Sequence, residues 1–286
     1  MRSLAQLISI VKERSNSLLI QLARLVLDRP ERRLIDSISV PNPEYKIPNT
    51  VYQTWETDIF GKRHHKSITK FRQQNPDFSF LLFDSTARDH YMEENWSQKV
   101  ILQVYRDSVF GAMKADIFRY CILFEKGGYY FDISKGLKAP ILSMIRPDNE
   151  FFVTQESTPL DDDSMDMSKY GLEKRKFLQW GLGFVPQHPI LAGVIQDIED
   201  RYESHYGRVF DDPKTAILNF TGPGAFTRAM YLFLDGNPEA SRKVLGVDFF
   251  GQEVFALKGS GYRFASFPSY SEIRNSPILV KKETTA

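Results

Sequence analysis

The sequence has one cysteine, Cys121, and only five histidines among its 286 residues. A single cysteine excludes an intrachain disulfide, and so few histidines at these spacings exclude a thiol-ligated zinc site. The formal net charge is +1, so no broad positive field indicates nucleic acid as a partner. No run of about eighteen uncharged apolar residues predicts a membrane-spanning helix. We also expect no secretory signal, because the N-terminus lacks an uninterrupted apolar core and a small-residue cleavage site.

The chain is long enough for a large hydrophobic core, and we expect two parts. Residues 1–46 are predicted to form an N-terminal amphipathic helix and a linker, and residues 47–281 one large α/β domain. Within the first part, residues 4–28 carry an apolar stripe of leucine, isoleucine and valine that is interrupted by Lys12-Glu13-Arg14. Such a helix packs on the domain, forms a short oligomer contact, or lies in the plane of a membrane surface.

Hydrophobic periodicity alternates between strand and helix through the first half of the domain. Strands are predicted at 50–52, 78–84, 129–131, 151–154 and 180–185, and helices at 67–74, 86–95, 97–107, 112–126 and 188–202. We expect solvent-exposed loops at 157–176 and at His64-His65, where neighbouring side chains are polar and basic. The order of strands and helices favours a parallel α/β sheet.

The stretch from 111 to 134, GAMKADIFRYCILFEKGGYYFDIS, is the most informative part of the chain. Its first half has helical spacing of apolar residues, and Gly127-Gly128 ends the helix because glycine accepts the left-handed backbone conformation. The aromatic residues that follow predict a short buried strand, which ends at Asp132. Ligands of α/β proteins usually bind at the carboxyl ends of the strands, so Asp132 is a candidate binding residue.

Asp116 and Arg119 lie three residues apart on the predicted helix, so both project from one face. Their simplest role is a structural ion pair. In a binding site, the carboxylate and the guanidinium group would orient sugar or ribose hydroxyls. A carboxylate such as Asp132 binds hard cations, Mn²⁺ or Mg²⁺, whose coordination is completed by phosphates and water. These residues alone leave both interpretations open.

Three segments in this order, IPNTVYQTW, AMKADIFRYCILFEKGGYYFDIS and TGPGAFTRA, resemble the DXD-containing sugar transferases of glycosyltransferase family 32. The resemblance covers roughly residues 47–235. It implies a GT-A fold, a Rossmann-like sheet with helices on both faces, in a hexosyltransferase that uses a nucleotide-sugar donor and retains the anomeric configuration. The catalytic residues that it implies are Asp132, Asp116 and Arg119. The donor-binding residues are Gln53, Thr54, Trp55, Asp116, Arg119, Tyr120, Gly128, Tyr130, Thr221, Gly222 and Pro223.

The metal motif differs from the family pattern, because it reads Asp132-Ile133-Ser134 and a serine stands where a second aspartate is expected. A neutral hydroxyl is a weaker ligand for a divalent cation than a carboxylate. We therefore expect Mn²⁺ or Mg²⁺ at Asp132 and Ser134, held more weakly than is usual in the family or partly replaced by Lys135. A further ligand near the C-terminus would have to be Asp, Glu, Ser or water, because His205 is the last histidine.

The function expected from the resemblance is transfer of a hexose from UDP- or GDP-hexose to a glycan or lipid-linked acceptor in surface-polysaccharide or glycoconjugate synthesis. The expected location is the cytoplasm, with peripheral membrane contact through residues 4–28. An alternative favoured by Ser134 is a catalytically silent GT-A-like protein that binds a glycan or acts as a scaffold. A nucleic-acid-binding or nucleotide-binding α/β protein is disfavoured by the net charge and by the lack of a phosphate loop.

Overall fold

The structure is a computed structural model, and it describes residues 31–159, 172–254, 256–261 and 270–281. Its strands are β1 (Arg32–Arg33), β2 (Thr50–Thr54), β3 (Ile59–Phe60), β4 (Ser79–Phe83), β5 (Gly128–Phe131), β6 (Gly136–Leu137), β7 (Phe151–Phe152), β8 (Gln155–Pro159), β9 (Arg175–Phe177), β10 (Gly181–Phe184), β11 (Val209–Phe210), β12 (Glu253–Val254) and β13 (Ser276–Pro277). Its α-helices are α2 (Lys62–Gln73), α3 (Ser85–Trp96), α4 (Val100–Asp107), α5 (Gly111–Lys126), α6 (Pro189–Asp200), α7 (Tyr202–His205), α8 (Pro213–Phe220), α9 (Pro223–Gly236) and α10 (Asp248–Gly251). Short 3₁₀ helices span Ile141–Met144, Pro238–Lys243 and Tyr270–Glu272.

A five-stranded sheet with the order β4-β2-β5-β10-β7 forms the centre of the molecule. Strand β2 pairs in parallel with both β4 and β5, whereas β10 runs antiparallel to β5 and to β7. The sheet is therefore mixed, and the prediction of a parallel sheet is correct only for β4, β2 and β5. Strand β10 reverses direction because the chain reaches it after the β8–β9 hairpin and not after a crossover helix.

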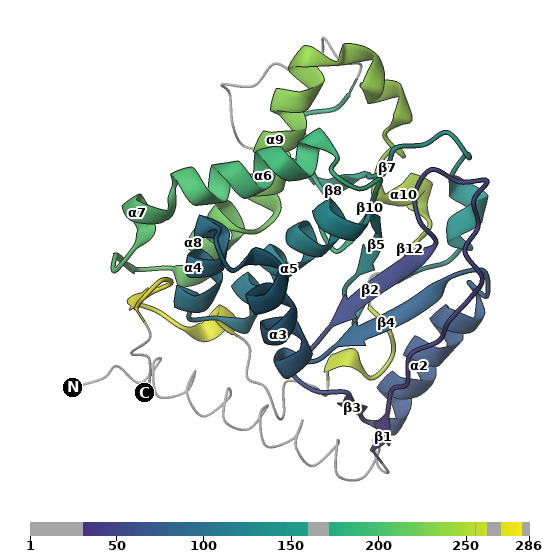
Figure 1. The fold of residues 1–286 in the computed structure, drawn as a ribbon, viewed down its shortest axis with the longest axis horizontal. Helices are drawn as coiled ribbons and strands as arrows, with labels where there is room; N and C mark the ends of the chain where they lie inside the picture. Colours follow the sequence, from purple (N-terminus) through teal and green to yellow (C-terminus); the bar gives the residue numbers. More distant parts are fainter. Residues whose placement is uncertain (1–30, 160–171, 255, 262–269, 282–286) are drawn as a thin grey trace, which may run out of the picture.

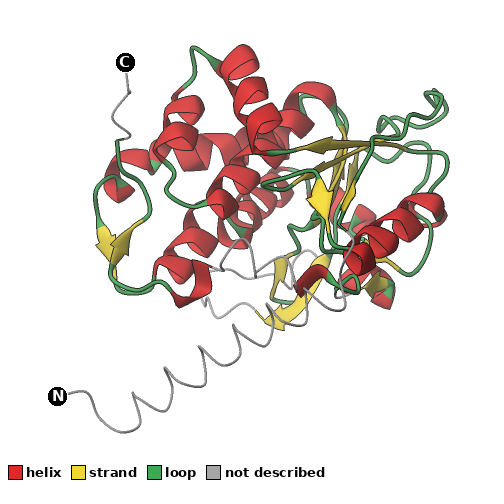
Figure 2. Cartoon of the chain, turned by 90° about the horizontal axis from the view of Figure 1, so that it is seen from below, coloured by secondary structure: helices red, strands yellow, loops and turns green. Residues whose placement is uncertain are grey.

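Helices cover both faces of this sheet (Figures 1 and 2). Because side chains alternate along a strand, Tyr130 of β5 packs with α5, α6 and α9 on one face. Tyr129 and Phe131 point the other way and pack with Phe71 of α2 and Phe80 of β4. The predicted α/β class, with helices on both faces, is confirmed.

The predicted helix–glycine–strand unit is present as α5 and β5. Helix α5 ends at Gly127, which has φ +64°, and its N–H donates to the Leu123 carbonyl at 2.9 Å. A side chain there would lie 2.6 Å from the ring of Pro186, so both backbone conformation and space require glycine. This tight connection places Asp132 directly after the last residue of β5.

Two predicted loops are wrong. Residues 157–176 contain parts of β8 and β9, which pair as an antiparallel hairpin around the residues outside the described range. His64 and His65 belong to α2, which begins at Lys62 and not at residue 67. His64 is buried because that turn of α2 packs against the loop after β5, whereas local polarity had indicated solvent exposure.

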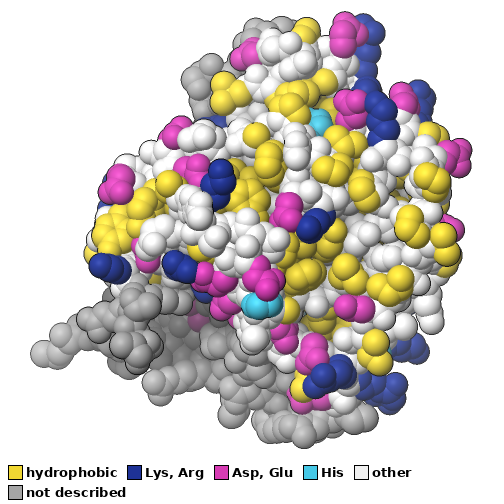
Figure 3. Space-filling model, in the orientation of Figure 1, with side chains coloured by type: hydrophobic (Ala, Val, Ile, Leu, Met, Phe, Trp, Pro, Cys, Tyr) yellow, Lys and Arg dark blue, Asp and Glu magenta, His cyan; other side chains and the backbone are white. Residues whose placement is uncertain are grey.

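The predicted linker lies against the domain where the structure describes it. Strand β1 pairs with β3, and Ser37 forms an isolated antiparallel bridge with Phe80. The predicted helix at 4–28 lies outside the described residues, and the division at residue 46 stays a prediction. Among the described residues, no helix is both long and apolar enough to cross a membrane. On the face seen in Figure 3, acidic and basic side chains are interspersed with apolar ones.

Candidate active site

A cavity of about 910 Å³ opens at the carboxyl ends of β2 and β5. The two strands are parallel, so the residues that follow them, Trp55 and Asp132, meet at one edge of the sheet. The cavity is lined by Thr54, Trp55, Glu56, Arg88, Val109, Phe110, Gly111, Ala112, Ala115, Asp116, Arg119, Tyr130, Asp132, Ile133, Ser134, Glu156, Gln179, Trp180, Leu218, Pro223 and residues 270–273.

Arg119 joins the two aspartates that the sequence singles out. Its Nη2 lies 3.1 Å from Oδ1 of Asp116 and 3.2 Å from Oδ1 of Asp132. The guanidinium group stacks on the ring of Tyr130, 4.5 Å from the ring centroid, and Tyr130 donates its hydroxyl to Asp132 at 3.1 Å. The expected Asp116–Arg119 ion pair is therefore present, and it extends to Asp132 within the cavity wall.

Buried polar groups from other parts of the chain hold Asp116 and Arg119 in place. The hydroxyl of Thr221, at the end of α8, donates to Oδ2 of Asp116 at 2.9 Å. The carbonyl of Thr221 accepts hydrogen bonds from Tyr120 and from the Gln179 amide. The carbonyl of Gln179 in turn accepts from Arg119 at 2.9 Å. Asp116 and Arg119 of α5 are thus fixed by residues that lie much later in the chain.

Burial sets the electrostatics of the pair. It raises the pKa of Asp116 to about 6, although Arg119 and the Thr221 hydroxyl favour the ionised form. Burial also opposes the charge of Arg119, but Tyr130, Asp132 and Asp116 outweigh it, so the pKa of Arg119 is raised. At neutral pH, the cavity wall presents an ionised pair, and Asp116 is close enough to its pKa for mild acid to protonate it.

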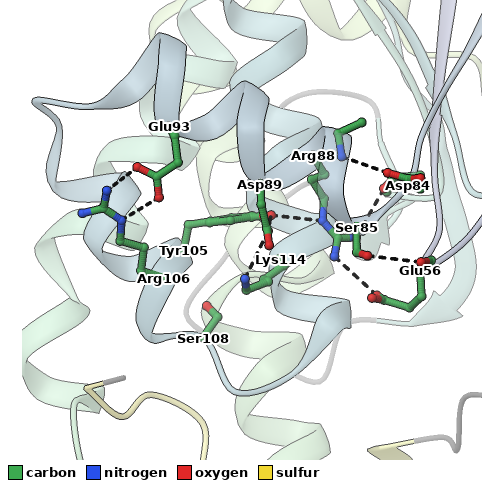
Figure 4. A network of polar contacts seen from close by, with 12 residues as sticks. Glu56, Asp84, Ser85, Arg88, Asp89, Glu93, Tyr105, Arg106, Ser108 and Lys114 are labelled. Atoms are coloured by element: carbon green, nitrogen blue, oxygen red, sulfur yellow. Dashed lines mark hydrogen bonds and ion pairs between the residues drawn. The ribbon is translucent and has the colours of Figure 1, made fainter. Parts of the chain in front are cut away.

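A second network fixes the other wall, at the end of β2 (Figure 4). Arg88 of α3 is 2% exposed and donates to the Tyr105 hydroxyl at 3.1 Å and to Thr54 Oγ1 at 3.3 Å. Its Nη2 also contacts Glu56 at 3.4 Å. Asp89 accepts from Tyr105 and Lys114, which ties α3 to α4 and α5. This network fixes Thr54 and Glu56 on either side of Trp55.

The structure brings most of the predicted site residues together. Those that line the cavity are Thr54, Trp55, Asp116, Arg119, Tyr130, Asp132, Ser134 and Pro223. Tyr120 and Thr221 lie behind the wall, and Gly222 precedes α9, where a Cβ would come 2.8 Å from Leu218 Cα. Their roles in donor binding stay predictions.

Gln53 and Gly128 lie away from the cavity lining. Gln53 is fully buried, and its side-chain oxygen accepts two hydrogen bonds from Arg72 of α2. Gly128 begins β5, at the opposite end of that strand from Asp132; it has φ +98°, and a Cβ would lie 2.6 Å from the Thr50 carbonyl oxygen. Both positions support the sheet, and neither is among the described residues that line the cavity.

Several lining residues escaped the sequence prediction. Gln179 and Trp180 reach the cavity because Gly181 of β10 pairs with Phe131, and Asp132 N–H donates to the Trp180 carbonyl at 2.8 Å. The available signal was that Trp180 begins the predicted strand 180–185, but the antiparallel direction of this strand was not visible in the sequence. Glu156 and residues 270–273 come from segments with no motif, so only the tertiary fold identifies them.

The donor set for a divalent cation is small. Within the described residues, the hydrogen bonds to the Asp132 carboxylate, from Arg119 and Tyr130, both fall on Oδ1, so Oδ2 is the oxygen that could bind a cation. Ser134 contributes a hydroxyl to the same cavity. In the described part of the chain, no group of three or more His, Cys, Asp or Glu side chains could hold a metal ion.

The charge of the cavity nevertheless favours a cation. Among the described residues, its lining contains five carboxylates, from Glu56, Asp116, Asp132, Glu156 and Glu272, and two guanidinium groups, from Arg88 and Arg119. An entering diphosphate adds negative charge, and a divalent cation that keeps water and phosphate ligands needs only one or two carboxylates. The residues therefore fit a weak cation site, in which phosphate and water supply most of the ligands, and not a site built from protein ligands alone.

Comparison with known proteins agrees with this geometry. Residues 61–152 match the family described as "Glycosyltransferase sugar-binding region containing DXD motif". The chain resembles the family 32 glycosyltransferases. The "Initiation-specific alpha-1,6-mannosyltransferase" of Candida albicans is 29% identical over 218 residues, which cover 70% of this chain and 56% of that protein. The "Inositol phosphoceramide mannosyltransferase 1" of Schizosaccharomyces pombe is 25% identical and covers 65% of this chain and 54% of its own length.

The chain spans about half the length of these curated relatives. A solved structure named "PaToxG Glycosyltransferase" superimposes with a TM-score of 0.51 and 17% identity, over 90% of this chain and 91% of that one. This similarity shows the fold, which is GT-A-like as predicted. The predicted resemblance to family 32 glycosyltransferases is confirmed by the family match and by the curated relatives. Proteins of the DXD-motif family generally use a divalent metal.

Proposed function

We propose that this protein is a hexosyltransferase that transfers a hexose from a UDP- or GDP-hexose donor to a glycan or lipid-linked acceptor. The observation that carries the proposal is the buried chain of contacts from Thr221 through Asp116 and Arg119 to Asp132, which lines a cavity at the carboxyl edge of the sheet. The relatives named as mannosyltransferases support the reaction class.

In the proposed site, Asp116 accepts hydrogen bonds from hydroxyls of the sugar or ribose, and Arg119 donates to their oxygens. The directions of both groups are fixed, because the Thr221 hydroxyl bonds to Asp116 and the Gln179 carbonyl bonds to Arg119. Trp55 offers an aromatic surface beside the end of β2 for the nucleotide. Asp132 and Ser134 would hold Mn²⁺ or Mg²⁺, more weakly than two aspartates would. When bound, the cation neutralises charge on the diphosphate.

The proposed reaction breaks the bond between the anomeric carbon and the diphosphate oxygen, whose electron pair leaves with the nucleoside diphosphate. The acceptor hydroxyl oxygen forms the new bond on the same face of the sugar, which retains the configuration. Its proton passes to an oxygen of the leaving phosphate. The chain's contribution is to orient the sugar through Asp116 and Arg119 and to place polar groups where charge develops.

A binding panel tests the proposal. Wild-type protein is titrated with UDP- and GDP-linked glucose, galactose and mannose by calorimetry, with Mn²⁺ and with EDTA. The proposal predicts that one of these donors binds, that Mn²⁺ strengthens binding, and that added acceptor or water releases the nucleoside diphosphate. No binding of any donor with Mn²⁺ present would contradict it.

The second candidate is a catalytically silent GT-A-like protein that binds a glycan or acts as a scaffold. Ser134 favours it, because the motif loses one of its two carboxylates. The same panel separates the two: this candidate predicts donor or glycan binding without release of a nucleoside diphosphate. Cytoplasmic location and membrane contact through residues 4–28 also stay proposals, which fractionation of the full chain and of a chain lacking those residues would test.

A further inference from the structure

The loop that carries Asp132 and Ser134 is held at each of its backbone carbonyls. The carbonyls of the three consecutive residues Asp132, Ile133 and Ser134 accept hydrogen bonds of 2.9, 2.9 and 2.8 Å from the Lys135 N–H, from His64 Nε2 and from the Leu257 N–H. Two of these donors are backbone groups, which every sequence provides. The donor to the middle carbonyl is a side chain, so this contact depends on residue identity.

His64 is built into the core beside this loop. It is 2% exposed, and its ring packs edge-on against Phe60 with centroids 5.3 Å apart. A carbonyl oxygen only accepts hydrogen bonds, so Nε2 of His64 carries the proton in this contact. Replacing the imidazole with an apolar side chain would leave the buried Ile133 carbonyl without its donor, which is costly in a dry environment.

The segment after β12 packs against the same histidine. Gly259 has φ +87°, and a Cβ there would come 2.6 Å from the backbone nitrogen of His64. One turn later in α2, Ser67 donates its hydroxyl to the Lys258 carbonyl at 3.0 Å. Helix α2, the Asp132–Ser134 loop and residues 257–260 therefore meet at one junction, and His64 lies at its centre.

We infer that His64 is a positioning residue for the candidate active site: its hydrogen bond to the Ile133 carbonyl fixes the directions of Asp132 and Ser134. Ile133 lies between these two residues, and all three line the cavity. Rotation of the peptide that carries the Ile133 carbonyl would turn Ser134 and tilt Asp132 away from Arg119. His64 itself touches no substrate. The inference rests on the proposed function in one respect: it takes the directions of Asp132 and Ser134 to be those that bind the donor.

The neighbouring histidine provides a matched control. His65 lies on the same helix, and its Nε2 contacts the Arg33 carbonyl at 3.1 Å. It is likewise a histidine bonded to a backbone carbonyl, but it borders a separate groove between α2 and residues 32–38 and not the candidate active site. His65→Leu removes the contacts of this ring with the Arg33 carbonyl and with Thr69, whereas His64, of these two histidines, contacts the Asp132–Ser134 loop.

The test uses the full chain with His64→Leu, His64→Gln and His65→Leu. Hydrogen–deuterium exchange of the peptide over residues 129–137 measures the loop directly, and calorimetry with UDP and GDP in the presence of Mn²⁺ measures binding. We expect His64→Leu to accelerate exchange in that peptide and to weaken nucleotide binding about tenfold. In His64→Gln, the amide N–H reaches a similar position, so slow exchange and nucleotide binding are mostly restored. His65→Leu leaves the exchange rate and the affinity unchanged.

The inference is overturned if His64→Leu exchanges and binds nucleotide as the wild type does. It is also overturned if His65→Leu shows equal changes in exchange and binding, or if His64→Gln recovers neither property. Thermal unfolding of all three variants identifies a general loss of stability, and the recovery by glutamine still decides the question if His64→Leu folds poorly. If wild-type protein binds neither nucleotide, the proposed function fails, while the exchange measurement still tests the positioning of the loop.

Discussion

The hydroxyl of Thr221 donates a 2.9 Å hydrogen bond to the carboxylate of Asp116, although the two residues are 105 positions apart in the chain. This contact joins the residue that follows α8 to the middle of α5, where Asp116 lines the cavity. It favours the ionised form of Asp116 and fixes its second oxygen, so that Oδ1 is directed at Arg119.

Thr221→Val removes this hydrogen bond and keeps the shape of the side chain. Because the bond favours the ionised carboxylate, its loss raises the pKa of Asp116 further and lowers nucleotide-sugar turnover at neutral pH by about tenfold. Thr227→Val is the matched control, since Thr227 is also buried and accepts a 2.9 Å hydrogen bond from Phe177 N–H outside the cavity. Equal turnover in the two variants would contradict the assignment of Thr221.

Protonation of Asp116 is expected to lower activity on the acid side of the pH profile, which is its acid limb. Its pKa rises from 3.8 to about 6 on burial, so the acceptor form is lost as the pH falls below that value. We expect kcat/KM for the donor to rise with pH through about 6 and then level off. In Asp116→Asn, turnover is low and this limb is absent. A wild-type profile that is flat between about pH 5 and pH 8 would show that Asp116 does not titrate in the free enzyme.

The raised pKa of Asp116 also predicts how the stability of the fold changes with pH. Since the folded pKa of Asp116 lies above the ordinary value of 3.8, the stability that it contributes is full below that pH and is lost as the pH rises through about 6. Denaturant titrations across this range compare wild type with Asp116→Asn, which cannot ionise. The free energy of unfolding of the wild type should fall relative to that of the variant as the pH rises.

Ser134→Asp tests the explanation for weak metal binding. A second carboxylate at the cavity restores the family pattern, so we expect Mn²⁺ to bind at least about tenfold more tightly by calorimetry than to wild type. Ser134→Asn, which is similar in size but neutral, should leave the affinity unchanged. If Ser134→Asp binds Mn²⁺ no better than wild type does, the cation is held elsewhere in the chain.

Much of this site could be predicted from sequence because its central part is local. The spacing of Asp116 and Arg119 on one helix, the glycine stop and the position of Asp132 after a short strand all follow from rules that span a few residues. The parallel direction of β2, β4 and β5 also follows, because strand and helix alternate up to β5. The structure agrees with each of these predictions.

The remaining features depend on contacts between distant segments. The reversed direction of β10 brings Gln179 and Trp180 to the cavity, and no local pattern encodes that direction. His64 looked solvent-exposed among basic neighbours, yet its environment is set by a loop 69 residues later in the chain. Gln53 lies in the motif that resembles the family, but Arg72 holds its side chain within the core and away from the cavity.

Release of nucleoside diphosphate from the hexose donor that binds best, in the presence of Mn²⁺, tests the proposed activity most directly. The variants are Asp132→Asn and Asp197→Asn, since Asp197 is also paired with arginine side chains but lies outside the cavity lining. We predict release by wild type and by Asp197→Asn, and a loss of at least about a hundredfold in Asp132→Asn. Equal rates in Asp132→Asn and wild type, or no release by wild type with any donor, would contradict a transferase centred on Asp132.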